Sequence, residues 1–317
     1  MNKIKWLLML AGFGVAAGMV YRAGVRELLP MINRLGWNLG WLWLYFFIPI
    51  TCAGMAWRAF FAYPQSYSVI KVVMASWVGL ACNWLLPVAQ VGGELAKARL
   101  LSTPSEDIEP WAAVVLDKTF QLITQCLFAL IGVVLLLAFY FDQAALEWSL
   151  AGIVFLALLA TGFWRLQRRG LMRLGKSLMD KVFKGQDETS QRQLATAMDQ
   201  RIQGMYHQPR RMVLASLWRM GFRFGMAGEV YLIMGWLGHP VGYLEAIVLE
   251  SLGQTVRMAA FMVPAGLGVQ ELTLTLLGSA LGIPPIASLS LSMGKRLREL
   301  VVGLPVLMGW LIWWRPR

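Results

Sequence analysis

The sequence predicts an all-α membrane protein, a polytopic helix bundle of about eight spans with two re-entrant segments interrupted by proline and glycine. Of the 317 residues, 58% are hydrophobic and only 15% are charged. This composition is far from that of a soluble globular domain. Long apolar runs also recur along the chain, each near the roughly 20 residues needed to cross the hydrocarbon core. We therefore take the bilayer as the solvent of most of the chain.

The predicted spans follow the apolar runs in chain order. The first run follows Lys3 and Lys5, but no clear small-x-small cleavage site closes it, so we interpret it as a helix and not as a secretory signal. Together the runs predict a single transmembrane domain over residues 1–317, with the orientation of its termini left open. They cover residues 4–21, 37–61, 68–86, 111–141, 147–164, 212–237, 244–263 and 285–314.

The basic charge is concentrated in one polar stretch. The net charge is +12, and eleven of the 29 basic residues lie between Arg165 and Arg211. Such a concentration predicts a cytoplasmic basic amphipathic insertion, residues 165–211, between the two halves of the bundle. Within it, residues 165–184 have the pattern of a helix lying on an anionic membrane surface, and a solvated linker is the alternative. This distribution argues against nucleic acid as a partner.

Two short segments form a weak internal repeat. "PVAQVGGE" begins at Pro87 and "PAGLGVQE" begins at Pro264, and each places a glutamate seven residues after its proline. Proline and glycine free backbone groups that must be satisfied inside protein or by water. Paired interruptions in two halves of a transporter mark a substrate site near the midplane. We therefore expect both segments to face a cavity, and a surface loop is the alternative.

Charged residues lie inside several apolar runs at helical spacing. Each charge at bilayer depth costs about 2.5–3.5 kcal/mol on insertion scales, so these side chains are expected to turn inward and pair across a hydrated groove. Structural salt bridges between helices are the alternative. Basic groups in such a groove neutralise a phosphate head, and acids hold those bases when it is empty. The predicted lipid- or headgroup-binding residues are Glu94, Lys97, Arg99, Asp117, Lys118, Glu250, Arg257, Glu271, Arg296 and Arg298. The predicted groove backbone is Pro87, Gly92, Gly93, Pro264, Gly266 and Gly268.

Two further arginines are left out of this predicted site. Arg219 and Arg223 are four residues apart in the sixth run, near its start. Long basic side chains at a helix end extend to the interface. A charged i, i+4 pair inside the run is one interpretation, and a position at the cytoplasmic end of that helix is the alternative.

Metal, cofactor and catalytic chemistry are not predicted. The three cysteines lie in apolar runs without paired spacing, and the two histidines lack metal-ligand spacing. A prenyl or glycosyl transferase would need an acid cluster for a metal-diphosphate, such as DxxxD, or a buried nucleophile beside a base. Neither pattern is present, so we expect no catalytic residues, no cofactor and no enzyme activity.

Four ordered motifs resemble those of a known family. They are "LLPVAQVGGELAKARLL", "VVLDKTFQL", "VLESLGQTVRMAAFMVPAGLGVQE" and "KRLRELVVGLPVLMGW". They resemble the lysylphosphatidylglycerol synthase transmembrane-region (flippase-like) family, and within it the hopanoid-biosynthesis-associated, HpnL-type membrane proteins. In that family the first motif carries a basic residue three positions after the acid, here Lys97, although Val88 and Ala89 replace its first glycines.

The resemblance implies a role with lipids. It implies a multi-pass protein of the bacterial inner membrane that translocates or carries an amphipathic lipid, of the phospholipid or hopanoid class. No aminoacyl-transfer domain follows the helices, so lipid-biosynthetic enzymes are expected as partners. A scaffold that holds such enzymes without transporting lipid is the alternative.

Overall fold

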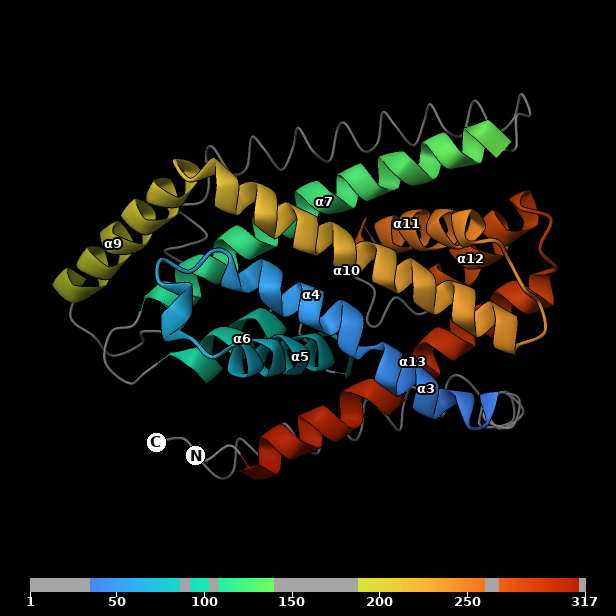
Figure 1. Cartoon of the computed structure of the whole chain (residues 1–317), viewed down its shortest axis with the longest axis horizontal. Helices are drawn as coiled ribbons and strands as arrows, with labels where there is room; N and C mark the ends of the chain where they lie inside the picture. The colour runs from blue at the N-terminus through green and yellow to red at the C-terminus, as the bar shows by residue number, and fades with distance from the viewer. Residues whose placement is uncertain (1–34, 86–91, 103–107, 140–187, 260–267, 314–317) are drawn as a thin grey trace.

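The computed structural model describes residues 35–85, 92–102, 108–139, 188–259 and 268–313 (Figure 1). Within these ranges all regular elements are helices, which confirms the all-α prediction. The predicted helices at 4–21, 147–164 and 165–184 lie outside them. The described helices are α3 (Asn38–Tyr45), α4 (Phe47–Arg58), the short 3-10 helix η1 (Pro64–Ser66), α5 (Val69–Leu85), α6 (Gly92–Leu101), α7 (Glu109–Phe139), α9 (Glu188–Tyr206), α10 (Pro209–Trp236), α11 (Tyr243–Ala259), α12 (Val269–Ala280) and α13 (Pro285–Trp313).

Length and composition support two membrane spans in the described part of the chain. They are Asn38–Arg58, which joins α3 and α4, and Glu109–Ala138 in α7. Helices α10 and α13 have 28 and 29 residues, but both carry several charges in their middle. The eight spans that the sequence predicts are therefore not established by the described helices, and their number stays a prediction.

The described helices form two halves with the same order. In each half a helix with 17 described residues, α5 or α11, is followed along the chain by a proline-glycine segment. A short helix of 10 or 12 residues follows, α6 or α12, and packs back against the helix before it. A long helix of 31 or 29 residues, α7 or α13, completes the half. The internal repeat predicted from two motifs thus extends to the helix order, although residues 86–91 and 260–267 themselves lie outside the described ranges.

The two halves pack reciprocally. Helix α4 lies beside its counterpart α10 and runs in the opposite direction (Figure 1). Helix α7 of the first half packs on α11 of the second, and α13 of the second packs on α5 of the first. Helices α7 and α13 also run in opposite directions (Figure 1). This arrangement is an approximate two-fold relation between halves of inverted direction, an architecture common among membrane transporters.

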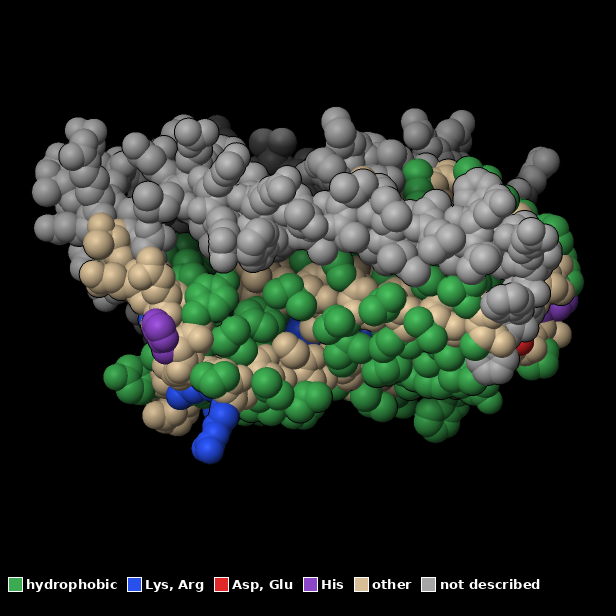
Figure 2. Space-filling model, turned by 90° about the horizontal axis from the view of Figure 1, so that it is seen from above, with side chains coloured by type: hydrophobic (Ala, Val, Ile, Leu, Met, Phe, Trp, Pro, Cys, Tyr) green, Lys and Arg blue, Asp and Glu red, His purple; other side chains and the backbone are tan. Residues whose placement is uncertain are grey.

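The outer face of the bundle is apolar. On α7, Ile123, Leu127, Leu130 and Val134 follow the spacing of one helical face and are 43–55% exposed. Figure 2 shows that hydrophobic side chains cover most of the described surface seen from above, with Lys and Arg concentrated near one end. Most large charged side chains of the middle of the bundle are instead buried. Apolar outside and charged inside is the inverse of a soluble protein and fits a surface that contacts lipid.

Candidate functional site

The first group of buried charges joins α6, α7 and α10. The Lys97 ammonium lies 2.6 Å from Glu94 on its own helix and 2.7 Å from Asp117 on α7. Arg219 of α10 donates from Nε to Asp117 at 2.9 Å, and its second nitrogen also contacts that carboxylate. Lys118 is half-buried and lies 3.4 Å from Glu94. Asp117 is only 1% exposed, so it depends on both bases for its stabilisation.

The second group lies around the middle of α13. Arg298 donates from Nε to Glu229 of α10 at 2.7 Å, and both side chains are fully buried. The rings of Phe46 and Trp84 flank the Arg298 guanidinium, with centroids 5.2 and 4.6 Å from its carbon. Arginine on aromatic faces is a stabilising arrangement for a desolvated cation. This contact therefore ties α3–α4, α5, α10 and α13 together.

Helix α11 contributes further pairs to the second group. Arg257 lies 2.7 Å from Glu299 of α13 and donates to the side-chain oxygen of Gln270 at 3.0 Å. Lys295 and Glu250 form a close ion pair between α13 and α11. Since one partner of each pair lies on α13, these bonds fix the rotation of that long helix.

Glu271 has a structural task at the start of α12. Its carboxylate accepts a bond from the backbone N–H of Gly268 at 2.8 Å, which caps the helix, and it also contacts Arg296. Gly268 has φ +81° and ψ −38°, a conformation that residues with a Cβ avoid. The second motif therefore ends in a glycine and an acid because the helix begins there.

Gly268→Ala should destabilise the protein by roughly 1–3 kcal/mol, because alanine is strained at this backbone conformation. A steric clash does not contribute, since no neighbouring atom lies within 4 Å of the added Cβ. The unfolding midpoint of the purified protein in detergent measures this. Gly204→Ala in α9 is the matched control, since a Cβ there also meets nothing within 4 Å and the backbone is helical. An unchanged midpoint for Gly268→Ala would contradict the assigned role.

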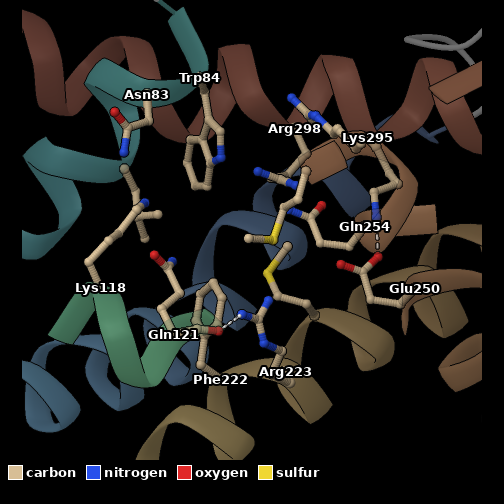
Figure 3. A pocket seen from close by; sticks show the side chains of 14 residues that line it. Asn83, Trp84, Lys118, Gln121, Phe222, Arg223, Glu250, Gln254, Lys295 and Arg298 are labelled. Carbon is tan, nitrogen blue, oxygen red and sulfur yellow. Dashed lines mark hydrogen bonds and ion pairs between the residues drawn. The ribbon is translucent and has the colours of Figure 1, made fainter. Parts of the chain in front are cut away.

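A cavity of about 80 Å³ lies between the two groups of charges (Figure 3). Its walls come from α5 and α7 of the first half and from α10, α11 and α13 of the second. Repeat-built transporters place their substrate sites at such an interface between halves. The lining residues are Leu80, Asn83, Trp84, Lys118, Gln121, Phe222, Arg223, Met226, Glu250, Gln254, Arg257, Met258, Lys295 and Arg298.

The buried or half-buried charges around this cavity are here called the buried charge network. Its bases are Lys97, Lys118, Arg219, Arg223, Arg257, Lys295, Arg296 and Arg298. Its acids are Glu94, Asp117, Glu229, Glu250, Glu271 and Glu299. The network supports both interpretations of the intramembrane charges. Most of the charges form salt bridges between helices, and several also line a cavity, as a hydrated groove requires.

The structure brings together most of the predicted site residues but not all. Arg99 is exposed on α6, apart from the network, so we leave it out of the site. Gly92 and Gly93 begin α6, whereas Pro87, Pro264 and Gly266 lie outside the described residues.

Sequence reasoning missed several members of the network. Arg219 and Arg223 do not extend to the interface: each is only 4% exposed, which favours the inward-facing pair over a position at the helix end. Their i, i+4 spacing was the available signal. Lys295 and Glu299 follow the polar face of α13, and Glu229 is a single acid in an apolar run. A lone charge in such a run is itself a sign of an inward-facing position.

An apolar exterior, two halves of inverted direction and charges buried around a central cavity define a helical membrane protein with a polar interior. Comparison with known families agrees: the chain belongs to the family described as the lysylphosphatidylglycerol synthase TM region, which matches residues 9–306. It is also 21% identical over 321 residues to the UPF0104 membrane protein PH1989 of Pyrococcus horikoshii, covering 96% of this chain and 95% of that protein. No solved structure matches significantly.

Proposed function

We propose that the protein translocates or carries an amphipathic lipid across the membrane. In this proposal the polar head of the lipid enters the cavity between the two halves while its chains stay in the bilayer beside the apolar outer face. The proline-glycine segments that begin at Pro87 and Pro264 are the proposed re-entrant segments that line this path. The protein is a carrier and not an enzyme, and it needs no cofactor.

One observation carries the proposal: a polar cavity lies where the two inverted halves meet, inside a bundle whose outer face is apolar. Salt bridges that served only to join helices would need no open space among them. A cavity lined by Lys118, Arg223 and Arg298 offers donors to a charged head that is too costly to move through hydrocarbon alone.

The four motifs quoted above support a finer assignment within the family. We place the chain with the hopanoid-associated, HpnL-type branch, in the bacterial inner membrane, with a hopanoid or a hopanoid-linked lipid as cargo. Residues 165–184 are proposed to lie on the anionic cytoplasmic surface. Lipid-biosynthetic enzymes would then supply the cargo.

A leaflet-resolved assay tests the proposal. The purified protein is reconstituted into vesicles that contain fluorescent phosphatidylglycerol or fluorescent phosphatidic acid, and an external quencher reports the lipid in the outer leaflet over time. We expect faster exchange of at least one probe than in protein-free vesicles. Gln254→Trp should abolish this gain, because Gln254 lines the cavity and a larger ring fills it without removing a charge.

Val256→Trp is the matched control for this variant. Val256 lies two residues further along α11, is 39% exposed and does not line the cavity. It should exchange lipid as the unmodified protein does. Equal exchange by Gln254→Trp and Val256→Trp would refute the cavity route. The scaffold alternative predicts a different result. Neither probe should then move between leaflets, and only the neutralisation of the basic residues in 165–184 should abolish the function of the protein in cells.

A further inference from the structure

The buried charge network is unbalanced among the described residues. It holds eight bases but only six acids, which leaves two positive charges without a counter-charge. The two adjoining segments of the sequence, 86–91 and 260–267, contain no acidic residue. A buried charge without a partner is strongly unfavourable. Among the described residues the network is therefore two negative charges short of neutrality, a deficit that a bound anion would fill.

Arg223 marks the place of this missing anion. Its guanidinium is 4% exposed and lines the cavity. It donates one bond, from Nη2 to the backbone oxygen of Gln121 at 2.8 Å, and its Nε has no partner. Among the described residues no carboxylate forms a salt bridge with it. The other bases of the network each form an ion pair with a described acid, whereas Arg223 contacts a backbone oxygen instead.

Two more bases face the same space. Arg298 is paired with Glu229 through Nε, but its Nη1 is buried without a partner. Lys118 is the most exposed base of the network and is only loosely held by Glu94, at 3.4 Å. Figure 3 shows Lys118, Arg223 and Arg298 on different sides of the cavity, with Gln121 and Gln254 between them. Donors thus converge from α7, α10 and α13.

The donors around the cavity and its volume both fit a phosphate group. Guanidinium groups bind phosphate through paired N–H donors, and they do so best when desolvated. A single water needs only about 10–15 Å³, so a cavity of about 80 Å³ has room for a group of phosphate size. A phosphomonoester carries about two negative charges at neutral pH, which equals the excess of the network. A phosphodiester carries one and would leave one base uncompensated.

We propose that this cavity is a binding site for a dianionic phosphate group, a phosphomonoester, with Arg223 as its principal ligand and Arg298 and Lys118 as further donors. The source of the phosphate rests on the proposed function: in a lipid carrier it is the head of the cargo. The anion site itself stands on the unpartnered donors of Arg223 and Arg298 beside the cavity and does not require transport.

Binding is tested on the full chain in a neutral detergent. The unfolding midpoint is followed during titration with inorganic phosphate, short-chain phosphatidic acid and short-chain phosphatidylglycerol, each against potassium chloride at matched ionic strength. We expect phosphate and phosphatidic acid to raise the midpoint in a saturable way, and phosphatidylglycerol to do so more weakly. Much tighter binding of phosphatidic acid than of phosphate identifies a lipid head as the source, whereas equal binding identifies free phosphate.

Arg223→Met separates a ligand role from a structural one. Because Arg223 forms no salt bridge in the described part of the chain, the variant should be at least as stable as the unmodified protein without phosphate, while its apparent Kd for phosphatidic acid rises on the order of 30-fold. Arg219→Met, one turn earlier on α10, removes a partner of Asp117 and should lower the midpoint without ligand. Arg99→Met on the exposed face of α6 should change neither property.

Two results would overturn the anion site. One is the absence of any phosphate-specific rise in the midpoint of the unmodified protein. The other is a loss of stability in Arg223→Met as large as that in Arg219→Met, which makes Arg223 structural. Failure of lipid exchange with intact, Arg223-dependent phosphate binding refutes only the carrier. Lipid exchange without phosphate binding refutes only the anion site.

Discussion

Asp117→Asn should destabilise the protein by about 3–5 kcal/mol, the cost of removing one partner from a buried ionic group. Asp117 is 1% exposed and holds two bases from different helices, Lys97 on α6 and Arg219 on α10. Asparagine is nearly the same size, so the loss comes from the charge and not from packing. A shift of this size is a large part of the net stability of a domain.

The unfolding midpoint and the yield of monodisperse protein in detergent measure this effect. Arg99→Gln is the control, because Arg99 is exposed on the same helix as Lys97. The double variant Asp117→Asn/Arg219→Gln should regain part of the loss, since Lys97 still has Glu94 at 2.6 Å. A midpoint for Asp117→Asn equal to that of Arg99→Gln would show that this carboxylate does not hold the helices together.

Gly93→Ala should separate α6 from α5, at a cost of roughly 3 kcal/mol or more. A Cβ at Gly93 would overlap the carbonyl oxygen of Gly79 and the side chain of Asn83. Asn83 also accepts a bond from the backbone N–H of Gly93 at 2.9 Å, which positions the first turn of α6. The obstacle on α5 includes rigid backbone, so it cannot rotate out of the way.

Loss of the contact between α6 and α5 should also disrupt the buried charge network. Because α6 carries Lys97 and Glu94, moving it breaks the pairs with Asp117 and Lys118. Gly93→Ala should therefore lower both the unfolding midpoint and any lipid exchange. Gly235→Ala in α10 is the matched control: nothing lies within 4 Å of its Cβ, and alanine favours a helix by about 1 kcal/mol. Equal midpoints for the two variants would refute the close packing at Gly93.

Helix positions were well predicted because they depend on local pattern. The apolar run at 212–237 became α10, Pro209–Trp236, and the run at 68–86 became α5, Val69–Leu85. These features follow from chain chemistry within about 20 residues, so they need no knowledge of the fold.

The partners of the charges could not be predicted in the same way. The sequence left open whether Arg219 lies at a helix end or faces inward, and in the structure it meets Asp117, 102 residues away. Arg298 meets Glu229, 69 residues away, although Glu229 gave only the signal of a lone acid. Which acid meets which base depends on how each helix is rotated and how closely it approaches the next. Close contacts between helices, such as that between Gly93 of α6 and Gly79 of α5, set this rotation and approach.

The sequence by itself determined an all-helical chain with an apolar exterior, a repeated proline-glycine motif and charges that could not face lipid. Those properties come from transfer free energies and backbone chemistry, which act on each segment separately. Only the tertiary structure decided that the halves pack in opposite directions around a cavity and that Arg223 forms no salt bridge with an acid among the described residues. The packing of the helices decides which acid lies next to which base. A base without a salt bridge can therefore be recognised only when all the helices are in position.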